Sequence, residues 1–483
     1  MRVKVISRSN DEFTRERSKD LQRVFKNLDP TLRPMEKAEE YVRALNAAKL
    51  DKIFARPFIG AMEVPDAVSC MAKNPDHLKG IFSGCMNGDI RLWDIASRRT
   101  VSRFIGHQGA VKGLTVSTDG RTLVSCGLDC TVRLWNVPDP SIMDDQSSDS
   151  TLEPSAVYTG QNAYKAVDHQ WGGNLFATAG AQLDIWDHNR SQPVNSFQWG
   201  VDTVVSVRFN PGEPNILASS GSDRNIAIYD LRLSTPARKI IMQNLIFITS
   251  SPRDTQFRTQ TALWLKPQDR SYFFSKTRTN SICWNPMEPL NFTAANEDCS
   301  CYSFDSRKMR EAKCVHRDHV SAVMDIDYSP TGREFVTGSY DRTVRIFPYN
   351  GGHSREIYHT KRMQRVFCVK FSGDASYVIS GSDDFNLRLW KAKASEQLGV
   401  LLPREQRKHD YHEALKNRHK HYDEVKRILR HRHLPQAVYK AQGLRRTMTE
   451  AERRKDERRR AHSGPSIAPK EPLRKKRIIT EIN

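Results

Sequence analysis

The sequence lacks the features that mark membrane, secreted and disulfide-bonded proteins. No stretch approaches about 18 uninterrupted apolar residues, so a membrane-spanning helix is not expected. The first eight residues contain no apolar core of the kind that directs secretion. The nine cysteines form neither a disulfide framework nor a zinc set, because the close pairs Cys126/Cys130 and Cys299/Cys301 have no second pair at ligand spacing. We therefore expect these cysteines to be small strand residues in a reducing compartment.

Signatures of catalysis are absent as well. The sequence has no phosphate-cradling Gly-Lys-Ser/Thr loop, no His-Glu-x-x-His pair and no nucleophile turn. Several histidines cluster near the C-terminus, including His419, His421, His431 and His433, but no cysteine or carboxylate completes a metal-binding set. We therefore expect no catalytic residue, no metal and no cofactor, and a non-catalytic role for the chain.

What the sequence does contain is a repeat of about 43 residues. Seven times, an aromatic residue ends a short alternating stretch and is usually followed by an acidic or polar residue. The seven pairs are Trp93-Asp94, Trp135-Asn136, Trp186-Asp187, Tyr229-Asp230, Phe304-Asp305, Phe347-Pro348 and Trp390-Lys391. Successive aromatics are 42, 51, 43, 75, 43 and 43 residues apart. This period is typical of a four-stranded propeller blade, so the sequence predicts an all-β, seven-bladed β-propeller.

A second set of residues recurs in the same register. Six positions before the aromatic stands a turn residue: Asn87, Asp129, Asp223, Asp298, Asp341 and Asp384. The pattern resembles the WD-repeat family, in which a histidine holds the turn aspartate and links it to a strand Ser or Thr and to the Trp. The resemblance assigns these structural roles to His107, Ser125, Asp129 and Trp135, and to His319 and Thr337 in the sixth repeat. Ordinary turn formation is the alternative, but it does not explain recurrence in register.

The repeats divide the chain into three parts. We expect an N-terminal, partly helical extension over residues 1–60, the propeller over 61–391 and a basic helical domain over 392–483. The third repeat has a shortened turn without the matching aspartate, so its blade should be less tightly tied. The long separations mark an acidic, Ser-rich loop over residues 137–156 and an insertion at about 244–276. The insertion is too short for another blade, and either an extruded loop or translated intron sequence explains it.

Helices are expected on both sides of the propeller. Residues 35–54 follow Pro34 and are rich in helix formers, and Val42, Leu45, Ala48 and Ile53 give this segment an apolar side for docking on the propeller or on a partner. Residues 404–430 have an apolar stripe at helical spacing, and a second helix is expected from about Gln436 to Ala461.

Positive charge is concentrated in the C-terminal part. The formal net charge is +20, and from Lys391 onward 26 Lys and Arg stand against 12 Asp and Glu, a net charge of +14. The dense clusters are Arg453, Arg454, Lys455, Arg458, Arg459 and Arg460, followed beyond a Gly-Pro-containing linker by Arg474, Lys475, Lys476 and Arg477. Such clusters engage an acidic import receptor or RNA phosphates, whereas the alternative is a solvated charged helix face.

The density of this positive charge favours a nucleic-acid partner over a solvated helix face. Few aromatic residues interleave with the arginines of residues 445–477, so base stacking by this segment is not expected. We therefore predict a free cationic arm that holds the RNA backbone without reading its sequence.

Nearly the whole chain resembles one family of WD-repeat proteins, the suppressor-of-fibrillarin (Sof) family. The motifs that carry the resemblance begin at Arg43 (Arg-Ala-Leu-Asn-Ala-Ala-Lys-Leu), Cys283 (Cys-Trp-Asn-Pro-Met-Glu), Phe292 (Phe-Thr-Ala-Ala-Asn-Glu-Asp), Tyr358 (Tyr-His-Thr-Lys-Arg-Met) and Arg430 (Arg-His-Arg-His-Leu-Pro). The resemblance implies a nucleolar protein of the small-subunit processome. Its partners would be pre-ribosomal RNA and proteins of the U3 small nucleolar ribonucleoprotein, which mature 18S rRNA.

A second implication comes from another group of WD-repeat proteins. Some are substrate receptors of cullin-RING ubiquitin ligases and present an aromatic-Asp-x-Arg motif to the ligase adaptor. Tyr229-Asp-Leu-Arg232 and Phe304-Asp-Ser-Arg307 fit this motif, which makes Arg232 and Arg307 candidate adaptor contacts. The alternative, favoured here, is that each arginine pairs with the neighbouring acid.

Overall fold

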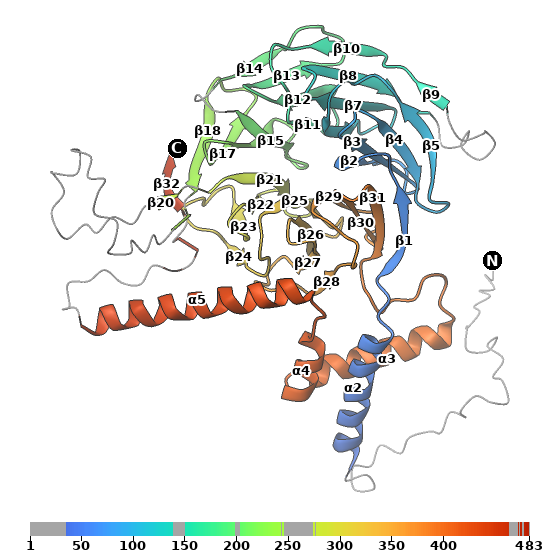
Figure 1. Cartoon of the computed structure of the whole chain (residues 1–483), viewed down its shortest axis with the longest axis vertical. Coiled ribbons are helices and arrows are strands. Elements are labelled where there is room, and N and C mark those ends of the chain that lie inside the picture. Colours follow the sequence, from blue (N-terminus) through green and yellow to red (C-terminus); the bar gives the residue numbers. More distant parts are fainter. Residues whose placement is uncertain are drawn as a thin grey trace, which may run out of the picture. The chain divides into compact units, whose positions relative to one another are not determined.

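The structure is a computed structural model of the whole chain (Figure 1). It describes residues 35–138, 150–198, 203–242, 244–245, 274–275, 277–462, 472, 474–475 and 478–482. The chain forms two compact units. The larger unit combines residues 57–393 with the part of the chain after Arg432. The smaller unit combines the residues before Pro57 with Ala394–Arg432.

The larger unit contains a ring of seven sheets, each with four antiparallel strands, which confirms the predicted propeller (Figure 1). Its strands are short and rich in β-branched and aromatic residues, with the buried positions of each sheet facing its neighbours. From blade 1 to blade 3 the strands are β2 (Val68–Lys73), β3 (Gly80–Cys85), β4 (Ile90–Asp94), β5 (Arg99–Phe104); β6 (Val111–Val116), β7 (Thr122–Gly127), β8 (Thr131–Asn136), β10 (Ala156–Thr159); and β11 (Ala166–His169), β12 (Leu175–Ala179), β13 (Leu183–Asp187), β14 (Asn195–Phe197).

The remaining blades repeat this arrangement. Blade 4 contains β15 (Val204–Phe209), β16 (Ile216–Gly221), β17 (Asn225–Asp230) and β18 (Pro236–Met242), and blade 5 contains β21 (Thr279–Trp284), β22 (Asn291–Asn296), β23 (Cys301–Asp305) and β24 (Cys314–His316). Blade 6 contains β25 (Val323–Tyr328), β26 (Glu334–Ser339), β27 (Val344–Pro348) and β28 (Glu356–Tyr358), and blade 7 contains β29 (Val366–Phe371), β30 (Tyr377–Ser382) and β31 (Asn386–Lys391).

The ring closes through a strand from the start of the propeller. β1 (Phe58–Glu63) pairs antiparallel with β31 and supplies the fourth strand of blade 7. The innermost strands contact each other in sequence around the ring, and β29 contacts β2 across the closure. β1 begins at Phe58, inside the segment that the sequence analysis assigned to the N-terminal extension, because a repeat in the sequence spans parts of two blades.

Two blades carry a fifth strand that the sequence did not reveal. β9 (Ser150–Leu152), at the end of the expected acidic loop, pairs parallel with β5 of blade 1. β32 (Ile478–Ile482), near the C-terminus, pairs antiparallel with β18 of blade 4. Of the insertion at about 244–276, the structure describes only the short pair β19 (Asn244–Leu245) and β20 (Phe274–Ser275); the rest lies outside the described residues, as does most of the acidic loop.

The smaller unit consists of three helices. α2 (Glu36–Ile53) packs against α3 (Pro403–His419) and α4 (Asp423–Arg430). The single helix expected over residues 404–430 is interrupted between His419 and Asp423. Ion pairs join Lys416 to Asp51 and Arg418 to Glu40 within this unit.

The buried side of α2 matches the predicted one only in part. Of the four predicted residues, Ala48 is buried and Leu45 is half-buried, whereas the side chains of Val42 and Ile53 are 50% and 71% exposed. Ala44 and Ala47 complete the buried side. The small alanine side chains let the helices approach closely, so the larger apolar residues remain outside. α5 (Gln436–Ala461), which belongs to the propeller unit, spans the predicted residues. Among the described residues, no helix has the length and apolar content to cross a bilayer.

Candidate nucleic-acid and protein interfaces

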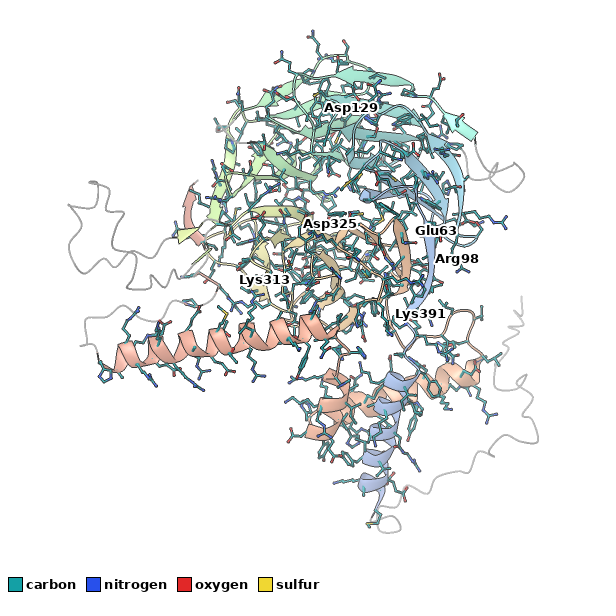
Figure 2. The ribbon with its side chains drawn as sticks, in the orientation of Figure 1. Glu63, Arg98, Asp129, Lys313, Asp325 and Lys391 are labelled. Atoms are coloured by element: carbon teal, nitrogen blue, oxygen red, sulfur yellow. The ribbon has the colours of Figure 1, made fainter. Side chains whose placement is uncertain are left out.

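The turn aspartate of blade 2 lies at the end of a four-residue hydrogen-bond network (Asp129 is labelled in Figure 2). The His107 Nδ1–H donates to Asp129 Oδ2 at 2.9 Å, and the Ser125 hydroxyl lies 2.7 Å from His107 Nε2. The Trp135 indole N–H donates to Ser125 Oγ at 2.8 Å. Burial lowers the pKa of His107 and outweighs the opposing effect of Asp129, so the ring is neutral at pH 7. The network ties a loop, a turn and two strands of one blade together.

Blade 6 repeats this network without its indole. His319 bonds Asp341 Oδ2 at 2.9 Å and Thr337 Oγ1 at 2.7 Å, while Phe347 occupies the Trp position. The indoles of Trp93, Trp186 and Trp390 each donate to a strand hydroxyl at 2.8 Å.

The other turn aspartates have partners other than histidine. Asp223 forms an ion pair with Lys239 at 3.7 Å, Asp298 accepts from the Tyr302 hydroxyl at 2.5 Å, and Asp384 pairs with Arg388. In blade 3, Asp184 instead accepts from Gln182 and Ser196. Each of these contacts lies within one blade and stabilises that blade.

A set of charged residues joins the inner strands of neighbouring blades (Asp325 of this set is labelled in Figure 2). Asp327 on β25 lies 3.6 Å from Lys370 Nζ on β29 and 3.5 Å from Lys73 Nζ on β2, and accepts from the Phe371 N–H at 2.9 Å. Burial opposes the charge of Lys370, but Asp327 and Asp325 outweigh it and raise its pKa. The acidic and basic side chains neutralise one another, so we interpret this set as a structural link between blades 6, 7 and 1.

The basic helix α5 is fixed to the propeller through its N-terminal half. Arg445 donates from Nη1 to the carbonyl oxygen of His319 at 2.5 Å and from Nη2 to that of Asp298 at 3.0 Å. Val438 is buried, and His359 Nε2 lies 3.2 Å from the carbonyl oxygen of His433 just before the helix. The helix therefore lies along the rim of blades 5 and 6 that carries the turn aspartates.

The predicted RNA contacts Arg453, Arg454, Lys455, Arg458, Arg459 and Arg460 are exposed on the C-terminal half of this helix. Arg453 forms an ion pair with Glu457 at 2.8 Å, one turn away. The less exposed positions Val438, Ala441, Arg445, Glu452 and Asp456 follow one side of the helix, so the two acids share a side with the residues that contact the propeller. The opposite side presents cations to solvent.

The segment beyond this helix is anchored as well, which corrects the prediction of a free arm. The Ala312 N–H donates to the carbonyl oxygen of Arg474 at 3.1 Å, and Lys475 lies 3.9 Å from Glu311. Ile478 of β32 packs against the core of blades 4 and 5. The cations of α5 thus lie between two attachments to the propeller. Of the remaining predicted contacts, Lys476 and Arg477 lie outside the described residues.

The two candidate adaptor contacts differ in their surroundings. Arg307 forms a bidentate ion pair with Asp305, with both N–O distances 3.1 Å, and its side chain is 66% exposed. Arg232 is exposed, and its backbone N–H donates to Asp230. The pairing expected under the alternative reading is thus present at Arg307. Arg238 of β18 donates to the carbonyl oxygens of Ser306 and Arg307, which connects blade 4 to the loop of Arg307.

Sequence reasoning missed Arg445 and β32. Nothing in the basic segment distinguishes Arg445 from its neighbours, because its partners are backbone carbonyls far away in the chain. The alternation in Ile478–Ile482 is a strand signal, but it is too short to stand out. In the described part of the chain, no group of three or more His, Cys, Asp or Glu residues has the arrangement of a metal site.

Two family models match parts of the chain. A family described as the Sof1-like domain matches residues 392–478, and the WD domain, G-beta repeat, matches 59–94, 98–136, 312–347 and 354–391. Residues 137–311, which include blade 3, blade 4 and the first three strands of blade 5, lie outside those matches although the structure contains these blades.

Full-length relatives are also similar to this chain. It is 43% identical over 483 residues to DDB1- and CUL4-associated factor 13 of Xenopus laevis, and 45% identical to that of Gallus gallus, with 100% of each chain covered. It is 41% identical over 503 residues to Protein SOF1 of Saccharomyces cerevisiae, covering 100% of this chain and 95% of the relative.

Proposed function

Because this chain belongs to the Sof1-like family of WD-repeat proteins, we propose that it is a non-catalytic scaffold in ribosome biogenesis. It acts in the nucleus and nucleolus, in the small-subunit processome with the U3 small nucleolar ribonucleoprotein, and contributes to maturation of 18S rRNA. The propeller supplies a rigid platform, and pre-ribosomal RNA is held by the cations of α5. The observation that carries the RNA contact is the exposed run Arg453–Arg460 on a helix that is fixed to the propeller through its N-terminal half.

Anchoring makes this helix a better RNA-binding element than a free arm. A tethered helix loses less conformational freedom when it binds, so more of the interaction energy appears as affinity. The exposed guanidinium and ammonium groups release counterions from the phosphates, so binding weakens steeply with salt. We propose the same role for Arg474, Lys475, Lys476 and Arg477, the second cluster of cations in the sequence.

The test replaces the six cations of α5, Arg453, Arg454, Lys455, Arg458, Arg459 and Arg460, with glutamine, which preserves helix propensity. We expect weaker binding to a transcript of the 18S precursor, because up to six phosphate contacts are lost. The slope of log affinity against log salt should fall by up to about 4, since each contact to single-stranded RNA contributes about 0.7. The measurement is fluorescence anisotropy from 50 to 200 mM KCl (about the range over which such contacts are resolved).

The matched control removes six exposed cations from blades 1, 2, 3 and 6: Lys79, Arg98, Arg99, Arg121, Arg190 and Arg333. It changes the net charge equally and leaves α5 intact. Equal affinities and equal salt slopes in the two variants would contradict the RNA role of α5. In cells, the α5 variant should also lose nucleolar retention and association with pre-18S RNA, while the control retains both.

A second candidate function is that of substrate receptor of a cullin-RING ubiquitin ligase. The names of the vertebrate relatives favour it, since they are DDB1- and CUL4-associated factors. Arg232 and Arg307 are exposed on adjacent blades, as an adaptor contact requires. Of the two, Arg232 is the stronger candidate, because Arg307 is already paired with Asp305. In this reading, charge reversal at Arg232 abolishes co-purification of the adaptor and leaves the RNA binding of α5 unchanged.

A further inference from the structure

The rim of blades 6 and 7 carries a group of aromatic and basic side chains that neither candidate function uses. Tyr340 follows β26, Arg342 lies in the next turn, Arg365 and Phe367 lie at the start of β29, and Phe385 lies in the turn between β30 and β31. We refer to these five residues as the rim patch. β26 and β29 are neighbours in the ring (Figure 1).

Three members of the patch are in contact across the boundary between the blades. The Tyr340 and Phe367 rings meet edge to face with centroids 6.0 Å apart, and the Arg365 guanidinium lies over the Tyr340 ring at 5.4 Å. Such a pair of rings with a guanidinium on one face is rigid, because each group restricts the rotamers of the others. The flat face of the guanidinium is itself a stacking surface for a nucleic-acid base.

Two members of the patch occupy backbone positions that disfavour large side chains. Arg342 and Phe385 follow the turn aspartates Asp341 and Asp384 and have φ values of 64° and 61°. This left-handed region favours glycine and asparagine, and a bulky residue there is strained. Phe385 is 50% exposed, so its ring is not held there by burial in the core. Two large side chains therefore project from the rim at a cost in backbone energy that core packing does not offset.

The charge around the patch is positive. Arg342 and Arg365 are exposed. Lys361 and Arg362, in the loop that leads to β29, are exposed as well. The turn acids of this rim are already bound, Asp341 to His319 and Asp384 to Arg388. Asp383 and Glu63 are further acids of blade 7 (Glu63 is labelled in Figure 2), which leaves a surplus of cations.

We propose that the rim patch is a second RNA site, which binds an unpaired segment by stacking its bases on Phe385 and Arg365 and pairing its phosphates with the surrounding cations. Stacking on aromatic rings beside a basic groove is the usual way in which proteins hold single strands. The proposal rests on the proposed function. It adds what α5 lacks, since few aromatic residues accompany the arginines of residues 445–477. The loop before β29 also contacts the segment before α5 through His359 and His433.

The test exploits the left-handed positions. The patch variant is Arg342→Asn with Phe385→Asn, and the control variant is Arg224→Asn with Cys130→Asn, which changes the same turn position in blades 4 and 2 (φ 71° and 60°). Asparagine tolerates this conformation, so both variants should fold, which near-ultraviolet circular dichroism checks. The probes are a labelled single-stranded RNA and a duplex RNA of equal length.

We expect the patch variant to bind the single strand at least about tenfold more weakly, because stacking on one ring is worth about 1–3 kcal/mol per base. Its affinity for the duplex should change less than about threefold, since paired bases are not available for stacking. Phe385→Tyr keeps a ring and should retain the affinity of the wild-type protein. The α5 glutamine variant should lose affinity for both probes.

The outcomes separate the two proposals. If the patch variant binds both probes as the control does while the α5 variant is weak, the second site is wrong and the proposed function stands. If the wild-type protein binds neither probe, both proposals fail. A glutamate-rich peptide that binds the wild-type protein but not the patch variant, with single-strand binding unchanged, would assign the patch to a protein partner and overturn the inference.

Discussion

At the scale of single residues, a buried carboxylate, Asp327, joins three blades of the propeller. Asp327 accepts from the Phe371 N–H and pairs with Lys370 and Lys73, so it connects blade 6 to blade 7 and to blade 1. Its side chain and that of Lys370 are 9% and 8% exposed. A charge this deeply buried depends on its partner, because water cannot replace the partner.

Asp327→Asn is therefore expected to lower the free energy of unfolding by about 3 kcal/mol, since Lys370 loses its nearest carboxylate. The amide oxygen of the new asparagine still accepts from the Phe371 N–H, so the lost stability reflects the missing negative charge and not a missing hydrogen bond. Urea denaturation of Asp327→Asn, Lys370→Met and the double variant checks this. We expect the double variant to be more stable than Asp327→Asn alone; strictly additive losses would show that the two side chains do not interact.

At the scale of elements, the C-terminal part combines a rigid helix with a strand. α5 contacts blades 5 and 6 through Arg445, and β32 extends blade 4. The strand covers the edge of β18, which would otherwise present unpaired backbone groups. The attachment also determines where the cations of α5 are presented.

Removal of residues 478–483 should leave the seven blades folded and expose the edge of β18. We expect faster amide hydrogen exchange in Pro236–Met242, unchanged exchange in Asn225–Asp230, and a loss of about 1–2 kcal/mol of stability as Ile478 leaves the core. Hydrogen exchange followed by mass spectrometry measures this, with a chain lacking only Asn483 as the control. Equal protection of Pro236–Met242 in both chains would mean that β32 does not pair there in solution.

At the scale of the whole molecule, stability depends on pH through histidines buried in several blades. Burial lowers the pKa of His107, His169, His188 and His319, and it lowers the pKa of His316 to about 4. The unfolded chain takes up protons on these rings near pH 6.5, whereas the folded chain does not. The stability that they contribute is therefore present above pH 6.5 and is lost as the pH falls toward their folded values.

We expect the urea midpoint to fall steadily from pH 7 to pH 4.5. His316 alone accounts for about 3 kcal/mol by pH 4, since each pKa unit corresponds to about 1.4 kcal/mol. His316→Gln, which can still donate to the Gly351 carbonyl oxygen, should show a smaller fall over the same range. A midpoint that is constant or rises between pH 7 and pH 4.5 would contradict neutral burial of these rings.

Much of the architecture was readable from local sequence. The seven aromatics and the turn aspartates recur in register because each blade has the same packing requirements, so this periodicity predicted the blades. The helix Gln436–Ala461 was also predicted from local sequence. The exposure of the cations of α5 could also be predicted, because a dense run of arginine on a helix cannot be buried.

Only the tertiary structure decided which distant residues meet. Arg445 binds carbonyl groups of two blades, β32 pairs with β18, and the rim patch combines residues of two blades whose turns come together when the ring closes. These contacts join positions tens to hundreds of residues apart in sequence, and no local pattern records them. Composition thus determined that the chain has a cationic end, whereas folding of the ring determined which carbonyl groups and which strand edge hold this end against the propeller.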